Sequence, residues 1–298
     1  MREIVSCPVC GGLERTKVYE STIDSKKIDS HNFDPYVAHY QINRCEGCHL
    51  IFSSPILDDN EVHALYEKAP HTNVAIGEEE NVRQTMRYYY NLARPFLKDR
   101  ERVLDIGCDM GFLLEAARQD GFREIFGIEP NPKARMVAAT VSGAVISDLY
   151  YEQQDFAADY FDLITLIHVL DHVFDPGEVL RRAWHHLKPG GVIFAVVHNV
   201  RSLLSATLGE RFPVYNLYHH YFFSKVTFGK LFAHNEFEVL QTISTYNCYS
   251  LNFLINKLPG LPASAKAFMG SFLDSVYLGR HPLTLPLGNV GIVARRPS

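Results

Sequence analysis

The stretch VLDIGCDMGF, residues 103–112, decides the fold. Its first four residues are typical of a buried strand, and the glycines that follow suit a tight turn leading into a helix. In an open α/β sheet the ligand lies beyond the carboxyl ends of the strands, so this turn is where a cofactor would bind. Gly107 and Gly111 flank the turn, but Asp109 stands between them where a third glycine is expected. An acid at that place limits which cofactor the turn can accept.

Strands and helices alternate on both sides of this stretch. Nearly continuous apolar runs, such as FDLITLIHVL and GVIFAVV, are typical of parallel strands buried on both faces. The pattern predicts a doubly wound α/β fold with a seven-stranded, mostly parallel sheet. We expect strands at 102–107, 124–129, 144–148, 161–168, 191–198, 237–246 and 289–295, and helices at 111–120, 131–141, 176–187 and 224–234.

Two C-x₂-C pairs precede this region. Cys7 and Cys10 form the first pair, and Cys45 and Cys48 form the second. Each pair places two thiolates on one turn, so the two turns together predict a tetrahedral four-sulfur site for Zn²⁺. Because four thiolates leave no open coordination position, the zinc is expected to be structural. Four unrelated buried thiols are the alternative.

The chain divides into three parts by its patterning. We expect a zinc-ribbon module at 1–67, a polar linker at 68–85 and the sheet domain at 86–298, with a helical insertion at 250–288. Apolar residues recur in the insertion at helical spacing, and charged residues are sparse there. The insertion is expected either to pack on the sheet or against a second copy, which would give a homodimer, or to form a platform for an apolar substrate tail.

Composition excludes several classes of protein. With 47% hydrophobic and 21% charged residues, the chain has the composition of a soluble globular protein. The N-terminus lacks the layout of a signal peptide and no apolar run reaches bilayer length, so we expect a cytoplasmic protein without stable membrane attachment. Residues 1–80 carry 7 basic and 14 acidic side chains, which disfavours nucleic acid as a partner. A small-molecule substrate is expected instead.

The acid in the turn argues against a dinucleotide cofactor. A G-x-G-x-x-G motif brings its middle glycine close to a pyrophosphate, and Asp109 would place a negative charge there. S-adenosylmethionine (SAM) carries a sulfonium and an ammonium but no phosphate, so it removes the objection. The stretch VLDIGCDMGFLLEAA indeed resembles the first motif of class I SAM-dependent methyltransferases, with G-x-D-x-G in place of the usual G-x-G-x-G.

That resemblance implies roles for residues of the turn. Asp105 matches the acid that the family uses near the methionine ammonium, and Gly107 and Gly111 match the outer glycines of the motif. Asp109 departs from the pattern, so it either faces the ammonium or points to solvent.

Further motifs extend the resemblance over about residues 86–246 and 289–297. In GIEPN, Glu129 matches the acceptor for both ribose hydroxyls. In ISDLY, Asp148 and Leu149 match the positions that hold the adenine. FDLITLIHVLDHVFDP resembles the fourth-strand motif, usually ending HVLEH, with aspartate for glutamate, and places His168 beside the cofactor.

The N-terminal part resembles a smaller group of proteins. INRCEGCHLIFSSPILDDNEVHALYE is similar to the zinc-ribbon lead-in of a bacterial methyltransferase subgroup that includes sugar-nucleotide C-methyltransferases. This likeness implies methyl transfer to a small hydroxylated or glycan-type metabolite, such as a nucleotide- or lipid-linked sugar.

Histidines supply the expected chemistry. Methyl transfer needs an aligned nucleophile and a group that takes its proton, a task for which histidine has a suitable pKa. YNLYHHYFFS resembles the family's H-x-x-[YF]-F-S segment, which places a histidine over the transferred methyl, and counting back from Ser224 selects His219. His219 is therefore the first choice of general base and His172 the second. The alternative is that His219 only forms hydrogen bonds within a loop.

Two other functions stay open at this point. An RNA methyltransferase is one, because zinc ribbons bind RNA, although the acidic balance of residues 1–80 argues against it. A catalytically inactive SAM-binding scaffold is the other, and Asp109 is the feature that raises it.

Overall fold

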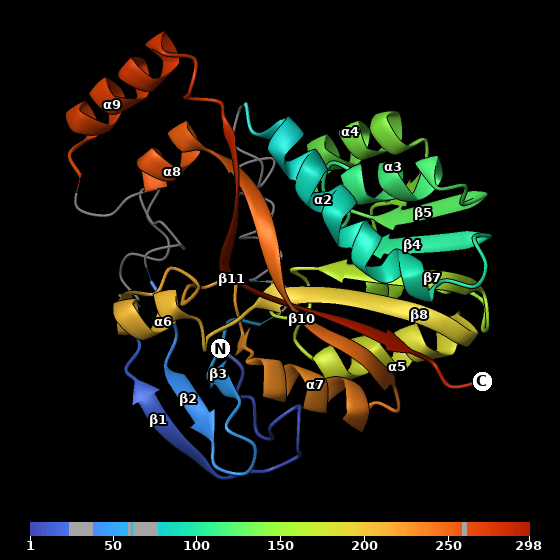
Figure 1. Cartoon of the computed structure of the whole chain (residues 1–298). Helices are drawn as coiled ribbons and strands as arrows, with labels where there is room; N and C mark the ends of the chain where they lie inside the picture. Colours follow the sequence, from blue (N-terminus) through green and yellow to red (C-terminus); the bar gives the residue numbers. More distant parts are fainter. Residues whose placement is uncertain (24–37, 59–60, 62–76, 258–260) are drawn as a thin grey trace.

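The structure is a computed structural model, drawn in Figure 1, that describes residues 1–23, 38–58, 61, 77–257 and 261–298. The end of the expected zinc-ribbon module, apart from residue 61, and the first part of the expected linker therefore lie outside the described residues.

A seven-stranded sheet forms the centre of the described chain. Its order is β10-β11-β8-β7-β4-β5-β6. The five strands β8, β7, β4, β5 and β6 run parallel to one another. Strand β11 pairs antiparallel with both β8 and β10. The expected α/β fold with a mostly parallel sheet is confirmed. The strands are β4 (Arg102–Ile106), β5 (Glu124–Ile128), β6 (Val145–Ser147), β7 (Phe161–Ile167), β8 (Leu187–His198), β10 (Glu238–Ser250) and β11 (Pro282–Arg295).

Helices cover both faces of this sheet (Figure 1). On one face lie α2 (Glu79–Ala93), α3 (Phe112–Gln119) and α4 (Pro132–Ser142), and on the other lie α5 (Pro176–His186) and α7 (Lys225–His234). Alternate residues of the buried strands point into the two apolar layers, as with Leu163 and Ile164 of β7. The burial of β7 on both faces explains its continuous apolar run.

Local sequence signals set where these helices begin. The side chains of Asn131, Asp175 and Ser224 accept hydrogen bonds from backbone N–H groups in the first turns of α4, α5 and α7. Helix α2 begins at Glu79, inside the range expected for the linker, so the linker ends earlier than 85. Three short helical turns, η1 (Arg94–Phe96), η2 (Tyr151–Gln153) and η3 (Gly209–Arg211), and the helix α6 (Leu203–Leu208) lie in the connections.

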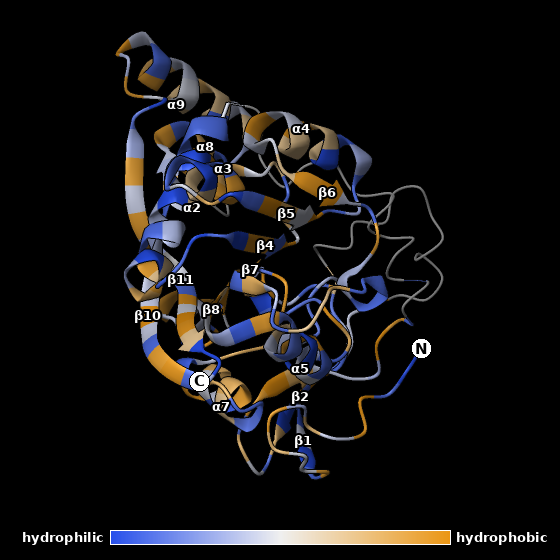
Figure 2. Cartoon of the chain, turned by 90° about the vertical axis from the view of Figure 1, so that its right-hand side faces the viewer, coloured by the Kyte–Doolittle hydropathy of each residue, from blue (hydrophilic) through white to orange (hydrophobic). Residues whose placement is uncertain are grey.

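The insertion near the C-terminus is shorter than expected. Because β10 and β11 continue as a hairpin beyond the sheet, only the segment between Ser250 and Pro282 is not strand, and it carries α8 (Leu251–Lys257) and α9 (Ala263–Ser275). Figures 1 and 2 place α9 at the end of the molecule opposite β1 and β2. Helix α9 has no buried residue, so this helix does not pack on the sheet, and the other two expectations for the insertion, packing against a second copy and a platform for an apolar substrate tail, stay predictions. Among the described residues, no helix is both long and apolar enough to span a membrane.

The N-terminal segment forms a second sheet with the order β1-β2-β3-β9. Its first three strands are β1 (Arg15–Tyr19), β2 (Ile42–Cys45) and β3 (Ile51–Ser53). The fourth, β9 (Tyr221–Phe222), belongs to the segment between β8 and α7 and pairs antiparallel with β3. The N-terminal segment is thus joined through a shared sheet to the loop that precedes α7.

Candidate active site

The turn after β4 has the conformation that its glycines permit. Gly107 and Gly111 have φ values of +71° and +75°, in the left-handed region where a side chain is strained. A Cβ at Gly111 would lie 2.9 Å from the backbone Cα of Ala138, so helix α4 packs directly against the turn. Asp109 is also left-handed, with φ +43°, and its backbone N–H donates to Glu129 Oε2 across 3.0 Å. This hydrogen bond joins the turn to the end of β5.

Three carboxyl groups meet at this turn. Asp105 is buried, and its Oδ1 accepts a hydrogen bond from Thr165 Oγ1 at 2.6 Å. Burial, together with the charges of Glu129 and Asp109, raises the pKa of Asp105 to about 7 despite the lowering effect of the hydrogen bond from Thr165. Burial and the charge of Glu129 also raise the pKa of Asp109 to about 7. Asp109 is half-buried and lies close to Asp105 and Glu129. Such a group of acids favours a cationic ligand.

Glu129 keeps hydrogen-bonding capacity for a ligand. Its Oε1 accepts from the Asn131 backbone N–H at 2.8 Å, and its Oε2 accepts from Asp109, so each oxygen retains a further lone pair. Burial raises the pKa of Glu129 above its ordinary value. Asp148 and Leu149, which follow β6, are exposed, and Asp148 Oδ2 lies 3.8 Å from Arg135 Nη2.

A second group of polar residues follows the neighbouring strands β7 and β8. Asp171 is buried, and its Oδ2 lies 3.0 Å from His198 Nδ1 and 3.9 Å from His219 Nε2. Its Oδ1 lies 3.9 Å from His172 Nε2. His168 is the first residue after β7, and the centroid of its ring lies 4.4 Å from that of His198. We call these five residues the histidine cluster.

Burial and neighbouring charges shift the pKa values of Asp171 and of three histidines in the histidine cluster. Burial by itself would raise the pKa of Asp171. The charges of the neighbouring histidines, above all His172, outweigh burial and hold this pKa well below its ordinary value. Burial lowers the pKa of His168 to about 3 and also lowers those of His172 and His219. At neutral pH the Asp171 carboxylate therefore lies beside the neutral imidazoles of His168, His172 and His219.

Comparison with known proteins now identifies the domain. Residues 79–242, more than half of the 298-residue chain, match the family described as "Methyltransferase domain". The chain belongs to this methyltransferase family. The matched range contains both the three carboxyl groups and the histidine cluster.

Curated relatives of this methyltransferase are also methyltransferases, and they match it over part of their length. The ubiquinone biosynthesis O-methyltransferase of Serratia proteamaculans is 32% identical over 117 residues, 37% of this chain and 48% of that protein. The enzyme of the same name from Caulobacter vibrioides is 35% identical over 118 residues, 37% of this chain and 46% of that protein. The chain thus matches about half the length of these curated relatives.

Solved structures support the fold. A SAM-dependent methyltransferase from Archaeoglobus fulgidus matches with a TM-score of 0.50 and 18% identity, covering 80% of this chain and 100% of that chain. The chain solved in complex with the Trm112 methyltransferase activator of Haloferax volcanii matches with a TM-score of 0.54 and 18% identity, covering 74% of this chain and 92% of that chain. The methyltransferase fold expected from the sequence is confirmed.

The structure brings most of the expected site residues of this methyltransferase together. Asp105, Asp109 and Glu129 meet at one turn, and His168, His172 and His219 meet around Asp171. Asp148 and Leu149 lie apart on the exposed rim after β6.

The sequence did not predict that Asp171 would be the centre of the cluster or that His198 would form a hydrogen bond with it. The signal available was an aspartate in the fourth-strand motif, where the family has glutamate, together with a histidine at the end of the next strand.

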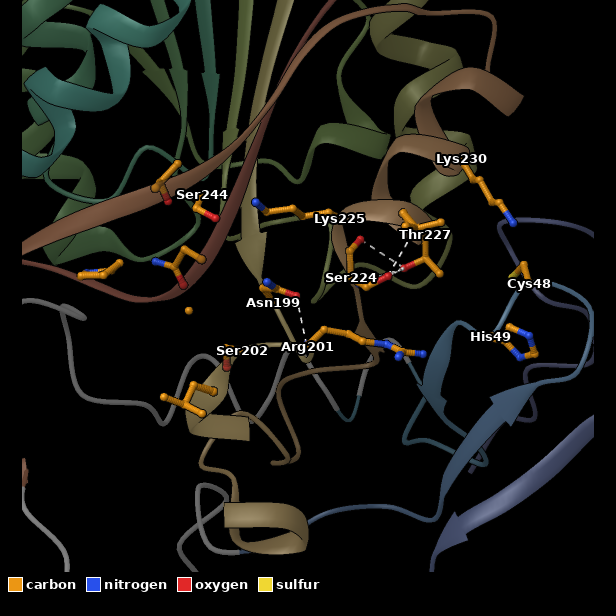
Figure 3. Close-up of a pocket in the computed structure, with 16 residues that line it drawn as sticks. Cys48, His49, Asn199, Arg201, Ser202, Ser224, Lys225, Thr227, Lys230 and Ser244 are labelled. Carbon is orange, nitrogen blue, oxygen red and sulfur yellow. Dashed lines mark hydrogen bonds between the residues drawn. The ribbon is translucent and has the colours of Figure 1, made fainter. Parts of the chain in front are cut away.

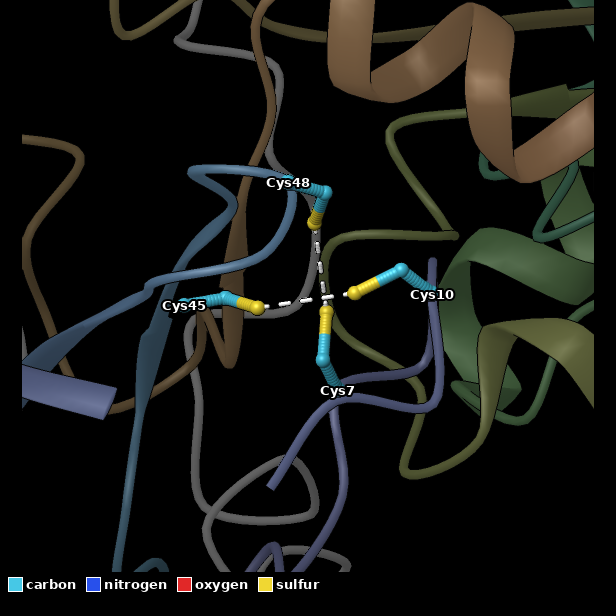
Figure 4. A group of neighbouring side chains, drawn as sticks. All are labelled: Cys7, Cys10, Cys45 and Cys48. Carbon is cyan, nitrogen blue, oxygen red and sulfur yellow. Dashed lines mark hydrogen bonds between the residues drawn. The ribbon is translucent and has the colours of Figure 1, made fainter. Parts of the chain in front are cut away.

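The four paired cysteines converge (Figure 4). Cys7 Sγ lies 3.4 Å from Cys48 Sγ, and Cys10 Sγ lies 3.5 Å from Cys45 Sγ, with all four sulfurs within 4.8 Å of one another. Zn–S bonds of about 2.3 Å in a tetrahedron place sulfurs about 3.8 Å apart, so the four thiols fit a zinc ion. A Cβ at Gly12 would lie 3.3 Å from Cys10 Sγ, so a side chain there would crowd the four sulfurs.

A cavity of about 650 Å³ lies between the N-terminal sheet and the end of β8 (Figure 3). Its lining includes the cationic side chains of Arg201, Lys225 and Lys230, together with His49. Asn199, which directly follows His198 of the histidine cluster, also lines it. The cavity is therefore suited to an anionic group of a ligand.

Proposed function

We propose that this chain transfers the methyl group of SAM to a hydroxyl oxygen of a small metabolite. The observation that carries the proposal is the buried Asp171 carboxylate, flanked by His198 and His219, at the edge of the sheet where β7 and β8 end. The cofactor turn follows β4, the strand next to β7, so acceptor and cofactor would meet at one edge. The family match and the relatives named O-methyltransferase also support it.

The acidic turn fits SAM. Asp105 and Asp109 would bind its cationic methionine part, because their shared burial makes a positive charge the favourable neighbour. Glu129 would accept hydrogen bonds from the ribose hydroxyls with its remaining lone pairs. When bound, SAM supplies a methyl group on a sulfonium that is ready to leave.

His219 would act as the general base for the acceptor. Its imidazole is neutral at neutral pH because burial lowers its pKa, and since a lowered pKa also weakens a base, uptake of the hydroxyl proton would depend on the nearby charge of Asp171. Asp171 Oδ2, at 3.9 Å, would stabilise the imidazolium that forms. His172, whose ring centroid lies 4.3 Å from that of His219, is the second candidate for this role.

The cationic cavity favours an acceptor that carries an anionic group. Arg201, Lys225 and Lys230 would bind a phosphate or carboxylate while the hydroxyl reaches the histidine cluster. A nucleotide- or lipid-linked sugar is one member of this class. The names of the relatives favour O-methylation over the C-methylation of the sugar enzymes that the N-terminal segment resembles.

We further propose that Cys7, Cys10, Cys45 and Cys48 hold one structural Zn²⁺. Its role would be to fold the N-terminal sheet that pairs with β9. The zinc ribbon would then support the active-site segment that contains β9, and it would not serve to bind nucleic acid.

Calorimetry with S-adenosylhomocysteine and transfer of labelled methyl from SAM to a panel of hydroxylated phosphates and carboxylates test the proposal. We expect binding and turnover in the wild type, and retained binding with turnover lowered at least about a hundredfold in His219→Asn. His281→Gln, which alters an exposed histidine beyond α9, is the matched control. Absence of cofactor binding would refute the function. Binding without turnover on any acceptor would favour an inactive scaffold, and label in RNA would favour the RNA enzyme.

A further inference from the structure

We propose that His168, Asp171 and His198 bind one divalent transition-metal ion, separate from the cysteine site. The ion would hold the acceptor oxygen beside the cofactor turn. Binding of the metal stands independently, whereas its role toward the acceptor rests on the proposed function.

The three side chains come from adjacent strand ends. His168 and His198 lie at the carboxyl ends of the parallel neighbours β7 and β8, and Asp171 lies in the turn between β7 and α5. One potential ligand atom from each of the three lies within 4.8 Å of the others. His198 Nδ1 and Asp171 Oδ2 form a hydrogen bond of 3.0 Å, and this separation is also that of two ligands about 90° apart on one ion with bonds of about 2.1 Å.

Two of these groups lack the partners that burial demands. Asp171 is only 1% exposed, yet no hydrogen bond reaches its Oδ1, and His168 Nδ1 is buried without a hydrogen-bond partner in the described chain. Buried polar atoms are almost always paired, so these two unpaired atoms, on two members of one His-Asp-His group, indicate a ligand. A cation bound by His168 and Asp171 would give both side chains a partner.

The neighbouring backbone orients the site. His168 has φ +54°, a left-handed conformation uncommon outside glycine, and its N–H donates to the Val196 carbonyl oxygen at 2.8 Å. This conformation places the His168 ring against that of His198, with centroids 4.4 Å apart. The ligands are thus held by two strands of the rigid sheet.

The donor set indicates which metal fits. Two imidazoles and one carboxylate are typical ligands of Zn²⁺ and Fe²⁺, and three protein ligands leave a position open for substrate oxygen. Four thiolates at the cysteine site leave none, so the two sites differ in chemistry.

The ion would assist the transfer without changing its own state. Bound to the metal, the acceptor hydroxyl loses its proton more easily, and His219, which is not a ligand, accepts that proton. The oxygen lone pair forms the new O–C bond while the S–C bond of SAM breaks. The electron pair of that bond stays on sulfur, and S-adenosylhomocysteine leaves.

Cobalt uptake by the full chain tests the site. With the cysteine site loaded, we expect the wild type to bind one further equivalent of Co²⁺, with weak visible bands and no added thiolate charge-transfer absorption. Asp171→Asn and His168→Gln should each weaken this binding at least about a hundredfold, because each removes a ligand. His281→Gln, an exposed histidine outside the cluster, should bind as the wild type does.

Circular dichroism and S-adenosylhomocysteine binding show whether each variant is folded, and His198→Gln gives a second ligand variant should Asp171→Asn fail to fold. No extra equivalent in the wild type, or unchanged uptake by the folded variants, overturns the proposal. Loss of cobalt in His172→Gln but not in His168→Gln would also overturn it, in favour of the other side of Asp171. Cobalt binding without methyl transfer would leave the metal site standing and refute the proposed function.

Discussion

The backbone N–H of Ser53 donates to the carbonyl oxygen of His220 across 2.8 Å, and Ser53 Oγ donates to the carbonyl oxygen of His219 across 3.3 Å. Ser53 ends β3, the strand that pairs with β9 just after these histidines. The N-terminal sheet is therefore a direct support of the loop that carries His219. Any change that unfolds this sheet should move the expected base.

Cys45→Ser tests that support. Losing one of four thiolates should release the zinc and unfold the N-terminal sheet, while the central sheet stays folded. We expect kcat for methyl transfer to fall at least about tenfold and the Kd of S-adenosylhomocysteine to stay within about twofold, because β3 pairs with β9 next to His219 and belongs to a different sheet from β4. Elemental analysis, calorimetry and kinetics measure the three quantities.

Cys248→Ser is the matched control, since Cys248 lies outside the cysteine site. Protein purified without chelators that contains no metal would show the zinc assignment to be wrong. Full activity after zinc loss would show that the loop does not need the ribbon.

Glu129→Ala should weaken SAM binding. The change removes the proposed ribose acceptor and also the oxygen that holds the Asp109 backbone N–H, so we expect a loss of roughly 2–3 kcal/mol, as for hydrogen bonds to a charged group. Calorimetry gives the dissociation constant. Glu238→Ala, an exposed glutamate at the start of β10, should leave it unchanged. A Glu129→Ala protein with wild-type affinity would rule out this residue as a cofactor contact.

Binding of SAM should depend on pH around 7. The pKa values of Asp105 and Asp109 in the free protein are raised to about 7, so both are largely protonated at lower pH and must lose their protons before they pair with a cation. Affinity should therefore rise from about pH 6 to about pH 8, with proton release on binding. Calorimetry in buffers of different ionisation enthalpy detects that release.

The same pKa values predict that the folding stability of the free protein falls as the pH rises toward 7. Relative to unfolded aspartates, with pKa about 3.9, the folded protein binds extra protons between about pH 4 and pH 7. This contribution to stability is lost as the pH rises through 7, so bound SAM should raise Tm more at pH 8 than at pH 6. Asp109→Asn should reduce this difference, and an identical pH profile in that variant would contradict the assignment.

Gly111→Ala should destabilise the cofactor turn. Its φ of +75° costs a side chain roughly 1–2 kcal/mol, and the new Cβ would lie 2.9 Å from the Ala138 Cα. We expect the free energy of unfolding to fall by more than that amount, measured by urea denaturation. Gly229→Ala is the opposite control, because Gly229 lies within α7 with no atom in the way and should gain up to about 1 kcal/mol. Equal effects would contradict the turn geometry.

The apolar side of α9 should bring two copies of the chain together. Phe268 and Phe272 are 75% and 58% exposed, and Tyr277 just beyond the helix is 94% exposed. Exposed apolar groups of this kind usually mark interfaces, so light scattering should report a dimer that Phe268→Ser with Phe272→Ser converts to a monomer. Met136→Ser, an exposed apolar residue of α4, is the control.

Flotation with anionic liposomes tests the other hypothesis for α9, that it forms a platform for an apolar substrate tail. Cations are sparse along this helix, so we expect no co-flotation. Strong co-flotation of a monomer would instead support a platform for an apolar substrate tail.

Local signals explain what could be predicted. The apolar runs of β7 and β8, the glycines of the turn and the spacing of each cysteine pair all act over a few residues, and the strands and helices lie close to where these signals place them. Several ranges failed at their ends, and β8 begins at Leu187 rather than at the expected residue 191. Helix α2 starts inside the expected linker, and the β10–β11 hairpin continues past the expected insertion boundaries, because cross-strand pairing extended both strands beyond their apolar cores.

The sequence by itself determined the α/β sheet, the cofactor turn with its acid and the two thiol pairs, since each depends on neighbours along the chain. Only the tertiary structure decided that Asp171 would be the centre of four histidines and that Ser53 would hold the loop of His219, 166 residues away. The physical reason is that parallel strands bring their carboxyl ends to one edge, and no local pattern records which side chains meet there.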